Sequence, residues 1–163
     1  MTRAAGSASA SGLRVAVIAS AFNEVVVRAL LDGALASLRS MGVADHHLQV
    51  TWVPGAFELP LAARTAAESG RFDAVVCLGA VIRGETPHFD LVAGEAARGI
   101  REVGVSTGVP VIFGVLTTET LDQALDRAGG AHGNKGWDAA VAAWQMVRAL
   151  DELRSGVPAA ARE

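Results

Sequence analysis

The chain has 163 residues, of which 51% are hydrophobic and 19% charged, and its formal net charge is −3. The length suits one domain, and the weakly negative charge excludes the broad basic surface that binds nucleic acid or anionic lipid. The low charged fraction indicates that other subunits cover part of the surface. The single cysteine excludes an intrachain disulfide and favours a reducing compartment, so we expect a cytoplasmic protein.

The two ends of the chain differ in composition from the region between them. Small residues dominate positions 1–12, which we expect to form a flexible or extended arm, and positions 155–163 are typical of a frayed tail. Residues 13–154 then form the one domain. No apolar run approaches the roughly 20 residues of a membrane-spanning helix, and residues 4–12 are too weakly apolar for a signal peptide. We therefore expect no membrane partner.

Short apolar runs alternate with helical periodicity along the domain. The runs predict strands, and the segments between them repeat apolar residues every three or four positions, as one face of a helix does. The predicted strands are 15–19, 49–53, 74–80 and 109–115. The predicted helices are about 26–38, 58–68, 88–103, 119–128 and 137–153.

Strands that are apolar throughout and separated by helices are typical of a parallel sheet covered on both faces. Right-handed crossovers place the helices in two layers. We therefore predict an α/β fold, a three-layer α/β/α sandwich with a four-stranded parallel sheet in flavodoxin-like order. Ligands of such sheets bind beyond the carboxyl ends of the strands, so the informative residues should directly follow the strands.

The segment after the first predicted strand reads SAFNE, residues 20–24. It lacks the glycines of a dinucleotide fingerprint, and the chain contains no GxxxxGK[ST] phosphate loop. Phe22 is an aromatic residue in an exposed turn. Two roles are open for it: a surface on which a ligand ring stacks, or a residue that folds back onto the following helix.

The turn after the second predicted strand contains Pro54 and Gly55. The backbone N–H groups of Ala56, Phe57 and Glu58 then open the next helix without intrahelical partners. Free N–H groups at this place can bind hydroxyl groups or an anion, although an ordinary Pro-Gly turn explains the same residues.

The third predicted strand leads into GAVIRGETPHFD, the most informative segment. Thr86 is the predicted N-cap of the next helix and Pro87 its first residue. The backbone N–H groups of Gly84, Glu85 and Thr86 should then converge at a helix N-terminus, which suits a phosphate. His88 falls in the first helical turn, where the helix dipole favours a neutral imidazole that can accept a proton. A solvated or capping histidine is the alternative.

The residues after the fourth predicted strand have simpler explanations. Thr117 and Thr118 are natural N-caps for the following helix, and Phe113 is most simply a core residue of the strand. Arg127 and Lys135 flank a glycine-rich segment, where either can hold an anion. Solvated surface cations are the simpler interpretation of both.

Taken together, SAFNE, GAFELP, GAVIRGETPHFD, FGVLTTET and DRAGGAHGNKG, in this order and spacing, resemble lumazine synthase over about residues 13–154. The resemblance implies a transferase that joins 5-amino-6-(D-ribitylamino)uracil to 3,4-dihydroxy-2-butanone 4-phosphate, releasing phosphate and water. The product is 6,7-dimethyl-8-ribityllumazine, and the reaction is the penultimate step of riboflavin biosynthesis. Such an enzyme requires no metal or other cofactor.

The resemblance also implies roles for individual residues. Contacts to the pyrimidine and the ribityl chain are implied for Phe22, Ala56, Phe57, Glu58, Ala80, Val81, Ile82, Phe113 and Lys135. Contacts to the phosphate are implied for Gly84, Glu85, Thr86 and Arg127, the last as a charged clamp. His88 would move protons during imine formation, phosphate elimination and ring closure. Phe113 would reach into the site of the adjacent subunit, which replaces its interpretation as a core residue.

Members of this family form pentamers, and in many bacteria twelve pentamers assemble into an icosahedral shell with sites between subunits. The uninterrupted AGGAHGNKG segment resembles the shell-forming members. We therefore expect a homopentamer assembled into a sixty-subunit shell, with riboflavin synthase as a candidate cargo. Two positions depart from many members: Leu91 replaces a tyrosine, and Asp138 replaces a glutamate but can still pair with Arg127 at shorter reach.

Two other classes of function stay open. The chain can be a shell or scaffold protein with relaxed catalysis, or a flavin-binding storage or sensor protein. A flavodoxin-like electron carrier is disfavoured because the first turn lacks a hydroxyl- and glycine-rich phosphate loop.

Overall fold

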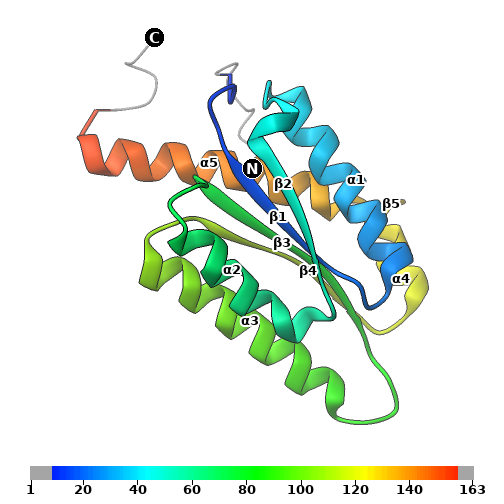
Figure 1. The fold of residues 1–163 in the computed structure, drawn as a ribbon. Helices are drawn as coiled ribbons and strands as arrows, with labels where there is room; N and C mark the ends of the chain where they lie inside the picture. The colour runs from blue at the N-terminus through cyan, green and yellow to red at the C-terminus, as the bar shows by residue number, and fades with distance from the viewer. Residues whose placement is uncertain (1–8, 158–163) are drawn as a thin grey trace.

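The computed structural model describes residues 9–157. Its strands are β1 (Val15–Ser20), β2 (Leu48–Val53), β3 (Ala74–Ile82) and β4 (Val111–Thr118), which form one parallel sheet in the order β2-β1-β3-β4. Its helices are α1 (Glu24–Ser40), α2 (Leu59–Glu68), α3 (His88–Thr107), α4 (Leu121–Asp126) and α5 (Lys135–Ser155). Helices α2 and α3 cover one face of the sheet, and α1 and α5 cover the other (Figure 1). The predicted three-layer sandwich is confirmed.

The alternation of side chains along β1 explains why its sequence is apolar throughout. Val15 and Val17 pack into the core beneath α1 and α5, whereas Ala16 and Ile18 pack into the core beneath α2 and α3. Successive residues of a strand point to opposite faces, so a strand covered on both faces has no position for a polar residue. The carboxyl ends of all four strands consequently meet at one edge of the sheet.

Strand β2 departs from the prediction that every strand is covered on both faces. It is the edge strand beside β1, and its four central residues, 49–52, are exposed. Val50 and Trp52 are each 37% exposed, and the Arg28 guanidinium lies 5.1 Å from the centre of the Trp52 ring. The position at the edge, where a neighbouring strand is absent on one side, accounts for the polar residues of β2.

The N-terminal caps of two helices differ from those predicted. Pro87 is the N-cap of α3 and His88 its first residue, because the Pro87 carbonyl already accepts the hydrogen bond of Asp90 N–H at 3.1 Å. Thr86 is therefore one position too early to be the cap.

The cap of α4 is Thr120. Its hydroxyl accepts a hydrogen bond from the Gln123 N–H at 3.2 Å, and the Gln123 side chain accepts one from the Thr120 N–H in return. Thr117 and Thr118 cannot cap this helix because they still belong to β4, in register with Val81 and Ile82. Helix α4 is accordingly shorter than the predicted helix 119–128.

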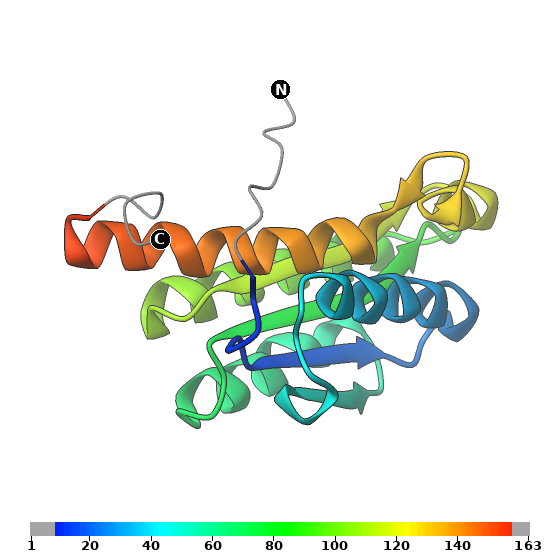
Figure 2. The ribbon, with the colours of Figure 1, turned by 90° about the horizontal axis from the view of Figure 1, so that it is seen from above.

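A small hairpin that the sequence did not predict joins α4 to α5. Its strands are β5 (Ala128–Gly130) and β6 (Gly133–Asn134), and it lies at the N-terminal end of the long helix α5 (Figure 2). The Asn134 side chain accepts hydrogen bonds from the Gly136 and Trp137 N–H groups and donates one to the Ala29 carbonyl at 2.9 Å. Asn134 thus caps α5 and joins it to α1.

The predicted arm and tail fall partly outside the described residues. Of the arm, residues 1–8 are outside, whereas Ala10 is buried and its N–H donates a hydrogen bond to the Met41 carbonyl at 2.9 Å. Of the tail, residues 158–163 are outside. None of the helices in the described part of the chain has the length and apolar character to cross a membrane.

Candidate active site

A cavity of about 790 Å³ lies at the carboxyl edge of the sheet. The loops after β1, β2 and β3 form its walls together with the first turns of α3; the loop from β3 to α3 is at the lower right of Figure 1. The predicted site residues that line it are Phe22, Ala56, Phe57, Glu58, Ala80, Val81, Ile82, Gly84, Thr86 and His88. Glu85 belongs to the same loop but is not among the lining residues.

Phe22 is held at this cavity by the backbone of the β1–α1 loop. The Ala21 N–H donates to the Val53 carbonyl at 2.8 Å, and the Phe22 N–H donates to the Pro54 carbonyl at 3.1 Å. The ring itself is 72% exposed, so it does not fold back onto α1. Of the two roles open for Phe22, a stacking surface fits this geometry.

The turn after β2 keeps two of the three predicted free amides. Residues Ala56–Glu58 form a short 3₁₀ turn, in which the Glu58 N–H donates to the Gly55 carbonyl at 3.2 Å. The prediction of a free amide at Glu58 is therefore wrong. The N–H groups of Ala56 and Phe57 have no acceptor among the described residues and remain open to a ligand.

The loop between β3 and α3 presents the predicted group of backbone donors. Its first residue is anchored, because the Arg83 N–H donates to the Thr118 carbonyl at 2.9 Å. The N–H groups of Gly84, Glu85 and Thr86 find no acceptor within residues 9–157, and they precede a helix of 20 residues. Unpaired amides at the positive end of a helix dipole favour an anion. His88 is exposed and lines the same cavity as Gly84 and Thr86.

The Arg83 side chain joins this loop to α3 and to the residue that follows β4. Its Nε lies 2.8 Å from Glu119 Oε2, its Nη2 lies 3.4 Å from Asp90 Oδ1, and its guanidinium stands 4.3 Å from the centre of the Phe89 ring. The hydrogen bond to Glu119 raises the pKa of Arg83 above its ordinary value. Two carboxylates thus pair with the Arg83 guanidinium. An anion at this loop therefore has the backbone amides, and not Arg83, as its available donors.

Phe113, Arg127 and Lys135 line a different cavity of about 460 Å³ between β4 and α5, and the two cavities share no residue. Phe113 is 43% exposed because β4 is an edge strand, so its interpretation as a core residue is wrong. Arg127 donates to the Gln123 carbonyl at 3.0 Å. Asp138 pairs with Lys135 at 3.0 Å and not with Arg127, contrary to expectation.

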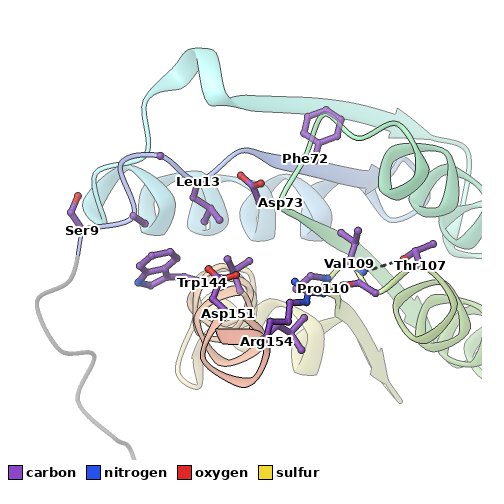
Figure 3. A pocket seen from close by; sticks show the side chains of 15 residues that line it. Ser9, Leu13, Phe72, Asp73, Thr107, Val109, Pro110, Trp144, Asp151 and Arg154 are labelled. Carbon is purple, nitrogen blue, oxygen red and sulfur yellow. Dashed lines mark hydrogen bonds between the residues drawn. The ribbon is translucent and has the colours of Figure 1, made fainter. Parts of the chain in front are cut away.

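A third cavity of about 510 Å³ lies at the opposite, amino edge of the sheet, where Leu13, Trp144 and Pro110 come together (Figure 3). Arg154 closes one side of it and donates a hydrogen bond to the Gly108 carbonyl at 3.0 Å. None of the predicted site residues lines this cavity. It is therefore separate from the candidate active site.

Two features of the described residues bear on other chemistry. Between residues 9 and 157, no group of three or more His, Cys, Asp and Glu side chains is arranged to hold a metal ion. Cys77 is buried in β3, and burial raises the pKa of its thiol to about 12. A thiol with this pKa is protonated at neutral pH and is a poor nucleophile.

Asn23 is a cavity-lining residue that the sequence analysis missed. Its Nδ2 donates a hydrogen bond to the Ala80 carbonyl at 2.8 Å, and its φ is 59°. An asparagine between an apolar strand and a helix is a usable signal, because asparagine is enriched at N-caps and in the left-handed region.

The family model described as 6,7-dimethyl-8-ribityllumazine synthase matches residues 12–151. The chain belongs to the lumazine synthase family. A 6,7-dimethyl-8-ribityllumazine synthase from Desulfatibacillum aliphaticivorans is 50% identical to it over 149 residues, which are 91% of this chain and 96% of the relative. The resemblance drawn from the sequence motifs is confirmed. The matched residues 12–151 include every residue predicted to contact the pyrimidine, the ribityl chain or the phosphate.

Proposed function

We propose that this member of the lumazine synthase family is the transferase that condenses 5-amino-6-(D-ribitylamino)uracil with 3,4-dihydroxy-2-butanone 4-phosphate to 6,7-dimethyl-8-ribityllumazine, in riboflavin biosynthesis. The observation that carries the proposal is one cavity with three features. It contains the unpaired N–H groups around Gly84 and Thr86, the exposed His88 imidazole, and the exposed Phe22 ring. These suit a phosphate, a proton transfer and an aromatic ring, respectively.

Each substrate has a matching part of the cavity. The pyrimidine stacks on Phe22 and meets the backbone of residues 80–82, while its ribityl hydroxyls bind at residues 56–58, where the Ala56 and Phe57 amides are free. The phosphate of the second substrate binds the amides of residues 84–86. The ketone then lies beside His88, because this histidine is the first residue of the helix that follows the phosphate loop.

The chemistry needs little beyond this arrangement. The pyrimidine amine attacks the ketone, and a first water leaves to give an imine. Phosphate is then eliminated, and the resulting enol becomes a ketone. The ribitylamino nitrogen attacks this ketone and a second water leaves, which closes the ring. Holding two reactants in a productive geometry supplies up to about 7–11 kcal/mol in favourable cases. Proton transfer by one histidine contributes roughly 10²–10⁴-fold more. His88 takes and returns the protons of these steps.

We further propose that two chains complete each site. Arg127, Lys135 and Phe113 line a cavity that shares no residue with that of His88, so a neighbouring chain brings them to the substrates. The exposure of Phe113 supports this arrangement. In the proposed assembly, pentamers form a sixty-chain shell in the cytoplasm that can enclose riboflavin synthase. The low charged fraction of the sequence supports extensive subunit contacts.

Incubation of the protein with both substrates tests the reaction, because the lumazine product absorbs light at longer wavelengths than either substrate. Product formation supports the proposal. A protein that binds flavin tightly and forms no product would instead be a storage or sensor protein, and one that assembles but does neither would be a scaffold.

Mixing two variants tests the shared site. His88→Ala and Arg127→Ala chains are unfolded together and refolded as mixed assemblies. If sites are shared, some sites receive both defects and others receive neither, so the mixture exceeds the activity of both parent variants. Activity equal to the average of the parents contradicts a site built from two chains. Sedimentation separates the pentamer from the shell, since a species of five chain masses alone rejects the shell.

A further inference from the structure

We infer that Asn23 is a positioning residue, which sets the place of the Phe22 ring and through it the pyrimidine; the inference rests on the proposed function. Asn23 is the one non-glycine residue with positive φ in the described part of the chain, at φ 59° and ψ 45°. Asparagine adopts this left-handed conformation more readily than most residues. The turn allows the chain to pass directly from β1 into α1 while Phe22 faces the cavity.

The side chain of Asn23 bonds to β3 and does not cap the helix that follows it. An asparagine directly before a helix ordinarily caps it with its side-chain oxygen, but Asn23 makes no such bond. Its Nδ2 instead donates to the Ala80 carbonyl at 2.8 Å, across to the end of β3. Its own carbonyl accepts from the N–H groups of Val26 and Val27 at 3.1 and 3.2 Å. Asn23 therefore joins α1 to β3.

These bonds hold Phe22 from two sides. On one side the Phe22 N–H is bonded to Pro54, after β2; on the other, Asn23 is bonded to Ala80, in β3. The exposed ring has little packing of its own to fix it. Loss of the Asn23 bond should consequently let the ring move relative to the backbone of residues 80–82, where the edge of the pyrimidine binds in the proposed function.

Two variants separate the side-chain bond from the backbone turn. Asn23→Asp tolerates the left-handed conformation but cannot donate to the Ala80 carbonyl, and Asn23→Gly adopts the conformation freely but has no side chain. Both should raise the KM for the pyrimidine on the order of fivefold, the effect of one ordinary hydrogen bond. The KM for the butanone phosphate and kcat should stay close to those of the unmodified protein. Thr107→Val is the control at the far end of α3 and should change neither KM. It removes two part-buried hydrogen bonds of the Thr107 hydroxyl, one donated to the Val103 carbonyl and one accepted from the Val109 N–H.

A double-mutant cycle with Phe22→Ala identifies the route of the effect. If Asn23 acts through Phe22, Asn23→Asp has no further effect on the pyrimidine KM in the Phe22→Ala background. A full fivefold effect in that background means direct contact of Asn23 with the substrate and overturns the inference. If the Asn23 variants change both KM values equally and also lower the melting temperature, the role of Asn23 is purely structural. That result overturns the inference as well.

Calorimetric titration with the pyrimidine alone separates this inference from the proposed function. If the protein binds the pyrimidine, and the Asn23 variants bind it about fivefold more weakly, the inference holds even where no lumazine is formed, and only the proposed reaction fails. If lumazine is formed and all variants bind the pyrimidine equally, the reaction holds and the inference fails.

Discussion

Gly136, in the first turn of α5, lies directly against the main-chain carbonyl of Leu30 in α1, where a β-carbon would have no room. Rigid backbone forms this contact, so the neighbouring atoms cannot move aside as a side chain does. The close approach allows Asn134 to reach the Ala29 carbonyl and cap α5 at once.

Gly136→Ala should therefore destabilise the protein by about 1–3 kcal/mol, the usual cost of overpacking. Gly94→Ala is the control, because a β-carbon there meets nothing within 4 Å inside α3. That change should stabilise by about 0.5–1 kcal/mol through the helix preference of alanine. Urea unfolding of both variants measures the difference, and equal midpoints would contradict the contact.

Thr120→Ala should lower the free energy of unfolding by about 1 kcal/mol, because it removes the cap of α4 and half of its reciprocal bond with Gln123. Thr117→Ala changes an exposed threonine of β4 that caps nothing and should stay within about 0.5 kcal/mol of the unmodified protein. Thermal unfolding compares them. If Thr117→Ala lowers the free energy of unfolding more than Thr120→Ala does, Thr117 is the cap of α4, as predicted from the sequence.

His88→Ala should lower kcat by about 10²-fold, the lower end of general acid–base contributions, and should leave measurable turnover because orientation of the substrates persists. The melting temperature should not change, since His88 is exposed and has no partner in the described residues. Steady-state measurement of product formation gives kcat. An unchanged kcat would remove His88 from the proton transfers.

Arg127→Ala should raise the KM for the butanone phosphate by about tenfold, as expected when a hydrogen bond to a charged group is lost, and should affect the pyrimidine KM little. Arg127→Lys should recover part of the loss, since lysine keeps the charge but not the two-pronged geometry. Arg101→Ala, which removes an exposed cation of α3, is the control. A KM that does not respond to Arg127→Ala contradicts the clamp.

Asp73 links stability to pH. Partial burial alone would raise the pKa of Asp73, but hydrogen bonds from the Arg14 side chain and N–H, together with the Arg14 charge, lower it below its ordinary value. The stabilisation is therefore present above the unfolded pKa of about 3.9 and is lost as the pH falls through the folded value. Asp73→Asn should be less stable at pH 7, and the difference should shrink below pH 4. A difference independent of pH would contradict this.

The sequence predicted the layers of the fold because the buried strands carry a physical signal. A run such as residues 74–80 is apolar at every position, which only a strand covered on both faces requires. The turns gave weaker signals. Thr117, Thr118 and Thr120 are chemically equivalent as caps, and the length of β4, which its pairing with β3 sets, decides among them.

The site was predictable only so far as it follows strand ends. Phe22 and Gly84 each lie two positions after a strand, His88 begins the helix that follows β3, and the parallel sheet brings them to one cavity. The pairing of Lys135 with Asp138 follows from their spacing of three residues on α5. The sequence alone did not identify it because each of these charged side chains had other possible partners. The role of Asn23 depends on a carbonyl 57 positions away, which no local pattern reveals.

The unpaired amides of residues 84–86 have a consequence for turnover. In the proposed function, the orthophosphate expelled during the reaction leaves from the same donors that bind it as an ester, and we expect it to keep those contacts until it diffuses away. The protein should then slow the departure of this leaving group, and orthophosphate in the medium should compete with the second substrate. We accordingly expect the fastest turnover in phosphate-free buffers.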